Sequence, residues 1–93
     1  MEPQSFRTIG EAAELVRRSI ARVLSPELAR RDESVDLVEG GLADSMAWVE
    51  ILVTIEGVTG IDSFGNPWPS DRPQSIGSLI QAVMEGLKGE TKL

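Results

Sequence analysis

Apolar residues at helical spacing mark the first third of the chain. Between Ala12 and Leu24 they recur every three or four positions, and charged residues take the opposite side. The apolar positions are Ala12, Leu15, Val16, Ile20, Val23 and Leu24, and the charged ones are Glu14, Arg17, Arg18 and Arg22. Just before them, Thr8 and Glu11 match a capping box, in which a hydroxyl and a glutamate bond the first amides of a helix. The pattern predicts a helix from about 8 to 24.

A second amphipathic pattern lies near the end of the chain. Its apolar positions follow the spacing i, i+3, i+4, i+7, i+8, i+11, and they are Ile76, Leu79, Ile80, Val83, Met84 and Leu87. Ser75 is the candidate cap in front of them, and Lys88-Gly89 is a candidate stop. This pattern predicts a final helix from about 75 to 88.

The middle segment is apolar on nearly every side. From Met46 to Glu56, the exceptions form a stripe through Ala47, Glu50 and Thr54. Alternating β-branched residues also allow a strand, but Asp44-Ser45 in front favours a helix from about 45 to 57. Because the segment is so apolar, we expect its neighbours to enclose it and to leave only the stripe available to partners.

The connections are long and differ in composition. Pro26 ends the first helix or starts a short turn, and residues 25–43 form a loop anchored by scattered apolar residues, namely Val35, Leu37, Val38 and Leu42. Residues 58–74 contain three of the five Pro and two of the nine Gly, so only a short helical turn fits there. The sequence therefore predicts an all-α fold, an antiparallel bundle of three main helices plus a short additional helix.

Composition limits both the size and the chemistry. With 93 residues and 41% hydrophobic content, the chain forms one domain, 1–93. It contains no His, Cys or Tyr, which excludes a Ser-His-Asp triad, a cysteine nucleophile, a Cys/His zinc site and a disulfide. The carboxylates of Asp44 and Glu50 lie more than a helical turn apart, without a partner base or a metal cluster. We therefore expect no enzyme and no metal.

The charge distribution indicates the class of partner. The net charge is −6, and no Lys or Arg occurs between Asp32 and Asp71, so an acidic end should attract basic partners and not nucleic acid. The first five residues lack the basic and apolar regions of a signal peptide, and no apolar run is long enough to span a bilayer. We expect a cytoplasmic monomer that contacts no membrane.

The pair Asp44-Ser45 carries the candidate chemistry. If Asp44 is the N-cap, its carboxylate bonds the first free amides and the Ser45 hydroxyl projects outward. A helix N-terminus also stabilises a phosphate through its dipole and its unpaired N–H groups. A phosphodiester on Ser45 would suit this position.

The stretch Gly41-Leu42-Ala43-Asp44-Ser45-Met46, continued by Val49-Glu50-Ile51-Leu52, resembles the acyl carrier protein family. Members carry phosphopantetheine on the Ser of an Asp-Ser-Leu motif that opens their second helix. The resemblance implies that a separate phosphopantetheinyl transferase attaches 4'-phosphopantetheine from coenzyme A to Ser45. The thiol of this arm would hold an acyl, polyketide or aminoacyl group as a thioester, while the chain itself catalyses nothing.

The resemblance also implies a docking face for acyl-loading, synthase and tailoring enzymes. Its residues would be Met46, Ala47, Glu50, Thr54 and Glu56. Several departures point away from general fatty-acid synthesis. Met46 replaces the usual Leu, Ala47 stands where fatty-acid carriers commonly place an acid, and Gly57-Val58-Thr59 interrupts the acidic helix end. The loop Ser63–Pro73 departs as well. We therefore expect a discrete carrier in a specialised pathway, for polyketide or other acyl cargo before aminoacyl or peptidyl cargo.

Other interpretations of these residues stay open. Ser45 can be a simple cap in an unmodified helical interaction module. Trp48 can pack in the core or contact the arm, and Trp68 can cover the bundle end or anchor a partner. Five apolar residues can line a cleft for an acyl chain or simply pack together, and these are Ile51, Leu52, Ile55, Ile61 and Ile80.

Overall fold

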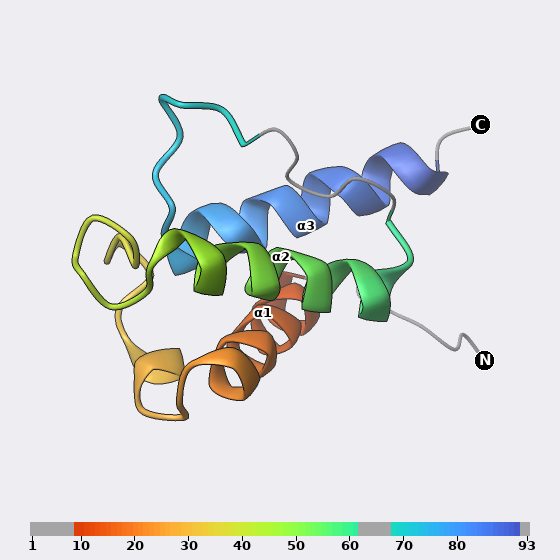
Figure 1. Cartoon of the computed structure of the whole chain (residues 1–93). Helices are drawn as coiled ribbons and strands as arrows, with labels where there is room; N and C mark the ends of the chain where they lie inside the picture. Colours follow the sequence, from red (N-terminus) through yellow and green to blue (C-terminus); the bar gives the residue numbers. More distant parts are fainter. Residues whose placement is uncertain (1–8, 62–67, 92–93) are drawn as a thin grey trace.

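The computed structural model describes residues 9–61 and 68–91, with side chains through residue 86. Within these ranges the chain forms three α-helices and one 3-10 turn, joined by loops (Figure 1). The elements are α1 (Ile9–Val23), the 3-10 turn η1 (Leu28–Arg30), α2 (Ser45–Thr59) and α3 (Ile76–Thr91). These ranges contain no strand and only an isolated bridge between Asp36 and Ser75. Nor does any helix in them combine the length and apolar character needed to cross a membrane. The predicted all-α class is confirmed.

Helix α1 packs against both α2 and α3. Its buried residues lie at the expected spacing, and they are Ala12, Leu15, Val16, Ser19 and Ile20. The Ser19 hydroxyl donates to the carbonyl oxygen of Leu15 at 3.0 Å, so this buried polar group is satisfied within the helix. From α3, the core receives Ile76, Leu79, Ile80, Ala82 and Val83.

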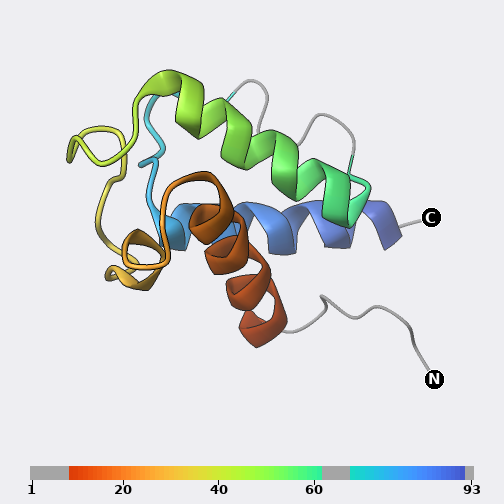
Figure 2. The ribbon, with the colours of Figure 1, turned by 60° about the horizontal axis from the view of Figure 1, so that its bottom comes forward.

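The helix directions differ from the antiparallel bundle that we expected. Helices α2 and α3 run in the same direction, and α1 crosses them (Figures 1 and 2). Helices α2 and α3 both start at the same end of the molecule, and the connection from Gly60 to Ser75 joins the end of one to the start of the other. Long connections in bundles permit this topology.

The helix ends depart modestly from the sequence pattern. Helix α1 is described from Ile9 onward. Thr8 of the expected capping box lies outside the described residues. Helix α2 begins at Ser45, as expected, and ends at Thr59. The Ser75 hydroxyl accepts from the amide of Ser78 at 3.2 Å, which confirms it as the cap of α3. The expected stop at Lys88-Gly89 is wrong, since α3 continues to Thr91. A Gly inside a helix costs only about 1 kcal/mol relative to Ala.

We expected a short helical turn in the second connection, which falls partly outside the described residues, and the structure has one in the first connection. It is η1, where the Ser25 hydroxyl oxygen accepts from the amide of Leu28 at 3.2 Å. Arg17 of α1 holds it by donating to the carbonyl oxygens of Ala29 at 2.7 Å and Arg31 at 3.0 Å. In the second connection, residues 62–67 lie outside the described residues and residues 68–74 form no helix, consistent with the prolines at 69 and 73.

Helix α2 is not enclosed by its neighbours, contrary to our expectation. It buries Trp48, Ile51, Leu52 and Ile55. Four large apolar residues of the helix are nevertheless exposed, with exposed fractions of 76% for Met46, 54% for Val49, 58% for Val53 and 53% for Val58. The reason is that α1 and the core cover one side of α2, while α3 makes no close backbone approach to it. An apolar surface therefore remains open.

Candidate functional site

Asp44 fixes the start of α2. Its backbone is extended, with φ −87° and ψ −179°, and its Oδ1 accepts from the amide of Ala47 at 2.8 Å. Its carbonyl oxygen accepts from the amide of Trp48 at 3.0 Å. Asp44 is thus the N-cap, and its carboxylate is occupied by the helix.

Ser45 follows as the first residue of the helix, and its side chain is exposed. Across residues 9–61 and 68–91, no group forms a hydrogen bond with its hydroxyl. The cap in front of it therefore does not use this hydroxyl. Amides in the first turn of a helix lack intrahelical acceptors and favour an anion. The position combines a free nucleophilic oxygen with an electropositive helix end.

The loop before Asp44 is held to the start of α3 by the carboxylate of Asp36. Its Oδ1 accepts from the amides of Val38 at 3.0 Å and Glu39 at 2.7 Å. Its Oδ2 accepts from the amide of Gln74 at 2.9 Å, and the Leu37 amide donates to the Gln74 carbonyl oxygen at 2.9 Å. These bonds order a segment that has no regular structure.

A tight turn then delivers the chain to Asp44. The carbonyl oxygen of Leu37 accepts from the amides of both Leu42 and Ala43 at 2.9 Å, while the Leu37 side chain is fully buried. A Cβ on Gly40 would lie 2.6 Å from the Asp36 carbonyl oxygen, and Gly41 has φ +77°. Both positions require glycine. The predicted anchoring of this loop by Leu37 is confirmed.

The five residues expected to meet partners do not share one exposed face. Met46 and Glu50 are exposed, whereas Ala47, Thr54 and Glu56 are half-buried. The Thr54 hydroxyl donates to the carbonyl oxygen of Glu50 at 2.8 Å, within the helix. The exposed surface of α2 therefore runs along its apolar residues more than along the predicted stripe.

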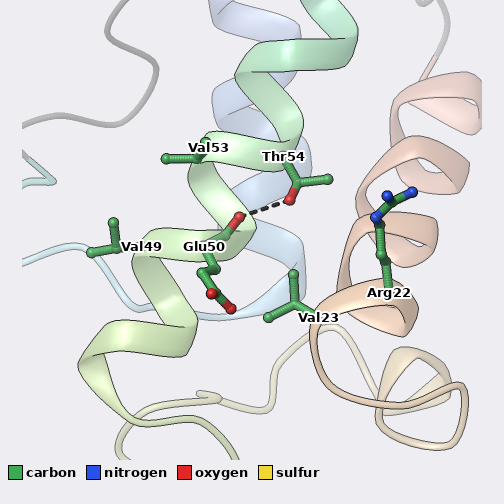
Figure 3. Close-up of a pocket in the computed structure, with 6 residues that line it drawn as sticks. All are labelled: Arg22, Val23, Val49, Glu50, Val53 and Thr54. Carbon is green, nitrogen blue, oxygen red and sulfur yellow. Dashed lines mark hydrogen bonds between the residues drawn. The ribbon is translucent and has the colours of Figure 1, made fainter.

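A shallow groove of about 390 Å³ separates α2 from the C-terminal end of α1 (Figure 3). It is lined by Arg22, Val23, Val49, Glu50, Val53 and Thr54. Sequence reasoning named Glu50 and Thr54 for this surface and missed the other four. The sequence did contain a signal for two of these four residues. Val49 and Val53 lie one helical turn apart, and each is next to a residue predicted to contact partners. The contribution of α1 had no local signal.

Trp48 of α2 packs against Trp68 of the second connection. Trp48 is 4% exposed, and its ring meets that of Trp68 edge to face, with ring centroids 5.2 Å apart. The Arg72 guanidinium carbon lies 5.0 Å from the Trp68 centroid, and Trp68 Nε1 donates to the Arg72 carbonyl oxygen at 3.1 Å. Arg72 also pairs with Glu85 of α3 at 3.2 Å. Of the two interpretations of each ring, this geometry favours core packing for Trp48 and a covering role for Trp68.

The five residues considered for an acyl cleft are all buried, with exposed fractions from 0% to 8%. Ile51, Leu52, Ile55, Ile61 and Ile80 belong to one continuous core. Ile61 packs so closely on α3 that a Cβ on Gly86 would lie 2.8 Å from its Cδ1. This packing favours a structural role for them.

Within residues 9–61 and 68–91, no cluster of acidic side chains is suited to hold a metal ion. Comparison of the chain with protein-family models, with curated proteins and with solved structures finds no match.

Proposed function

We propose that this chain is a discrete carrier protein of the acyl carrier type, with 4'-phosphopantetheine attached to Ser45. The observation that carries the proposal is the exposed hydroxyl of Ser45, directly after the Asp44 cap and without a hydrogen-bond partner among the described residues. A hydroxyl needed only for capping would accept from a helix amide, but here Asp44 does so instead.

The geometry at this helix end fits a phosphodiester. The phosphate would lie beside the first-turn amides, where the helix dipole favours negative charge. The Asp44 carboxylate is already bonded to the Ala47 amide, which reduces its repulsion of a neighbouring phosphate. When bound, the arm supplies a thiol, a group that this cysteine-free chain lacks. The chain's own part is to present Ser45 on an ordered helix start.

The finer features of the proposal follow from the same surface. A phosphopantetheinyl transferase modifies Ser45, and acyl-loading, synthase and tailoring enzymes then act on the arm. The exposed Met46, Val49 and Val53 support a specialised acyl or polyketide pathway over one that relies on an acidic docking helix. Aminoacyl or peptidyl cargo is the alternative within this class.

The test is the intact mass before and after incubation with coenzyme A and a promiscuous phosphopantetheinyl transferase. We expect a gain of one phosphopantetheine in the wild type and none in Ser45→Ala. Ser70→Ala is the matched control, because Ser70 is also exposed but lies outside α2. A gain that survives Ser45→Ala would place the arm elsewhere and contradict the proposal.

The exposed apolar residues of α2 also favour a second candidate function, that of an unmodified protein interaction module. The same mass measurement separates the two. No gain on a folded wild-type protein would support the interaction module, in which Ser45 only begins the helix.

A further inference from the structure

Packing accounts for the ring of Trp48 but not for its N–H group. The side chain is 4% exposed, and its Nε1 is buried without a hydrogen-bond partner among the described residues. Within that part of the chain, it is the only buried side-chain nitrogen or oxygen that lacks a partner. A buried donor without an acceptor is costly, and native structures keep few of them. The Trp48 N–H is therefore a candidate contact for a group that the chain itself does not contain.

The unsatisfied donor belongs to the helical turn next to the candidate attachment residue. Trp48 follows Ser45 by three residues, which corresponds to about 4.5 Å along the axis of α2. Long side chains in a helix lean toward its N-terminus and cover the preceding turn, which here is the turn of Asp44 and Ser45. An arm that starts at Ser45 and follows the inner side of α2 therefore reaches Trp48 before the other buried residues of this helix.

The side chain that covers Trp48 is weakly held. Trp68 packs edge to face on Trp48 with ring centroids 5.2 Å apart, and its own Nε1 donates to the carbonyl oxygen of Arg72 in the same connection. Arg72 in turn pairs with Glu85 of α3, whose side chain is 65% exposed. An ion pair this exposed contributes little to stability. Trp68 and Arg72 can therefore move together and uncover Trp48 without breaking the hydrogen bond between them.

We infer that the Trp48 N–H donates a hydrogen bond to an amide carbonyl of the phosphopantetheine arm, and that Trp68 moves aside to admit it. The inference rests on the proposed function and deepens it, because it assigns the arm a contact on this chain besides Ser45. The groups match chemically, since the arm carries amide carbonyls between its phosphate and its thiol, and an indole nitrogen is a donor only. The Trp68 N–H cannot replace that of Trp48, because it is already bonded to Arg72.

The test is the nitrogen–proton correlation NMR spectrum of the indole groups before and after phosphopantetheine transfer, with the product checked by intact mass. The chain contains two Trp, so Trp48→Phe and Trp68→Phe each remove one indole cross-peak, and either variant assigns both. We expect the Trp48 peak to move downfield in the modified protein, and its indole N–H proton to show a nuclear Overhauser contact with protons of the arm. Ser45→Ala, incubated with the same coenzyme A and transferase, is the matched control and should show neither change.

The outcomes separate this inference from the function on which it rests. If the wild type gains no phosphopantetheine, the proposed function fails, and this inference fails with it. If the wild type is modified but the Trp48 N–H proton shows no contact with the arm, the hydrogen bond is wrong while the carrier function stands. A shift of the Trp48 peak without that contact would reflect movement of the two rings alone and also overturn it. The same shift in Ser45→Ala would assign the effect to free coenzyme A and not to the attached arm.

Discussion

The two faces of α2 have similar composition and opposite surroundings. The inner face consists of Trp48, Ile51, Leu52 and Ile55, with exposed fractions from 0% to 8%. The outer face consists of Met46, Val49 and Val53, with exposed fractions from 54% to 76%. Hydrophobicity alone therefore does not decide which face of an isolated helix is buried. What decides is where α1 and the core lie.

This difference separates two uses of apolar residues. The inner face stabilises the fold by removing area from water. The outer face contributes much less burial, and it lies beside Ser45 and along the α1–α2 groove. Under the proposed function, these apolar residues are where a partner enzyme is expected to bind.

The largest effect should come from truncating the inner face. Ile55→Ala removes a fully buried side chain, and we expect it to lower the free energy of unfolding by about 2–5 kcal/mol. Val53→Ala, on the outer face, should change it by no more than about 0.5 kcal/mol. Urea denaturation followed by circular dichroism measures both. Equal losses would mean that the two faces do not differ in burial.

The sequence predicted the helices better than their arrangement. The spacing of apolar residues located α1 and α3, because both are amphipathic and their buried faces agree with the pattern. The same reasoning failed for α2, whose apolar residues surround the helix and indicate no direction. The parallel course of α2 and α3 depends on the connection from Gly60 to Ser75, which has no periodic pattern.

The candidate site was predictable where it is local. Asp44 and Ser45 are adjacent, so the cap and the free hydroxyl follow from standard helix geometry. The bond from the Gln74 amide to Asp36 joins residues 38 positions apart, and no local rule indicates it. The groove likewise needs Arg22 and Val23 from another helix. The contacts between segments that are distant in the sequence could not be predicted.

The C-terminal end of α2, where both faces stop, should be the next most sensitive position. Gly60 has φ +76°, and its amide donates to the Glu56 carbonyl oxygen at 2.8 Å. Because a Cβ is strained in this left-handed conformation, Gly60→Ala should destabilise the fold by about 1–2 kcal/mol in thermal or urea unfolding.

Gly57→Ala is the control for that substitution. Gly57 lies inside the same helix with open space around its Cα, so Ala there should stabilise the fold by about 0.5–1 kcal/mol. Opposite signs are expected from the same chemical change three residues apart. Destabilisation by both would show that the end of α2 tolerates no added methyl group, whatever the backbone conformation.

A smaller effect is expected at the N-terminal end of α2, where Asp44 caps the helix that carries both faces. Asp44→Ala removes the acceptor of the Ala47 amide and should cost about 1 kcal/mol in urea unfolding. Asp44→Asn retains an acceptor oxygen and should restore most of the loss. If Asn destabilised as much as Ala, the negative charge and not the hydrogen bond would be the source of the stability.

The smallest effect concerns pH, and it arises in the loop before α2, away from both faces. The Asp32 carboxylate accepts from the hydroxyl of Ser34 and from its amide, and these bonds lower the pKa of Asp32 below its ordinary value. Since the folded pKa is the lower one, the ionised form favours the folded state. Its contribution is present above the unfolded pKa and is lost as pH falls through the folded pKa. Asp32→Asn should therefore be slightly less stable than the wild type at neutral pH, and urea unfolding should show the gap closing in acid. When Ser34→Ala is also present, the difference in stability that Asp32→Asn makes at neutral pH should be smaller, because the hydroxyl donor is gone. A difference between wild type and Asp32→Asn that grew in acid would contradict this sign.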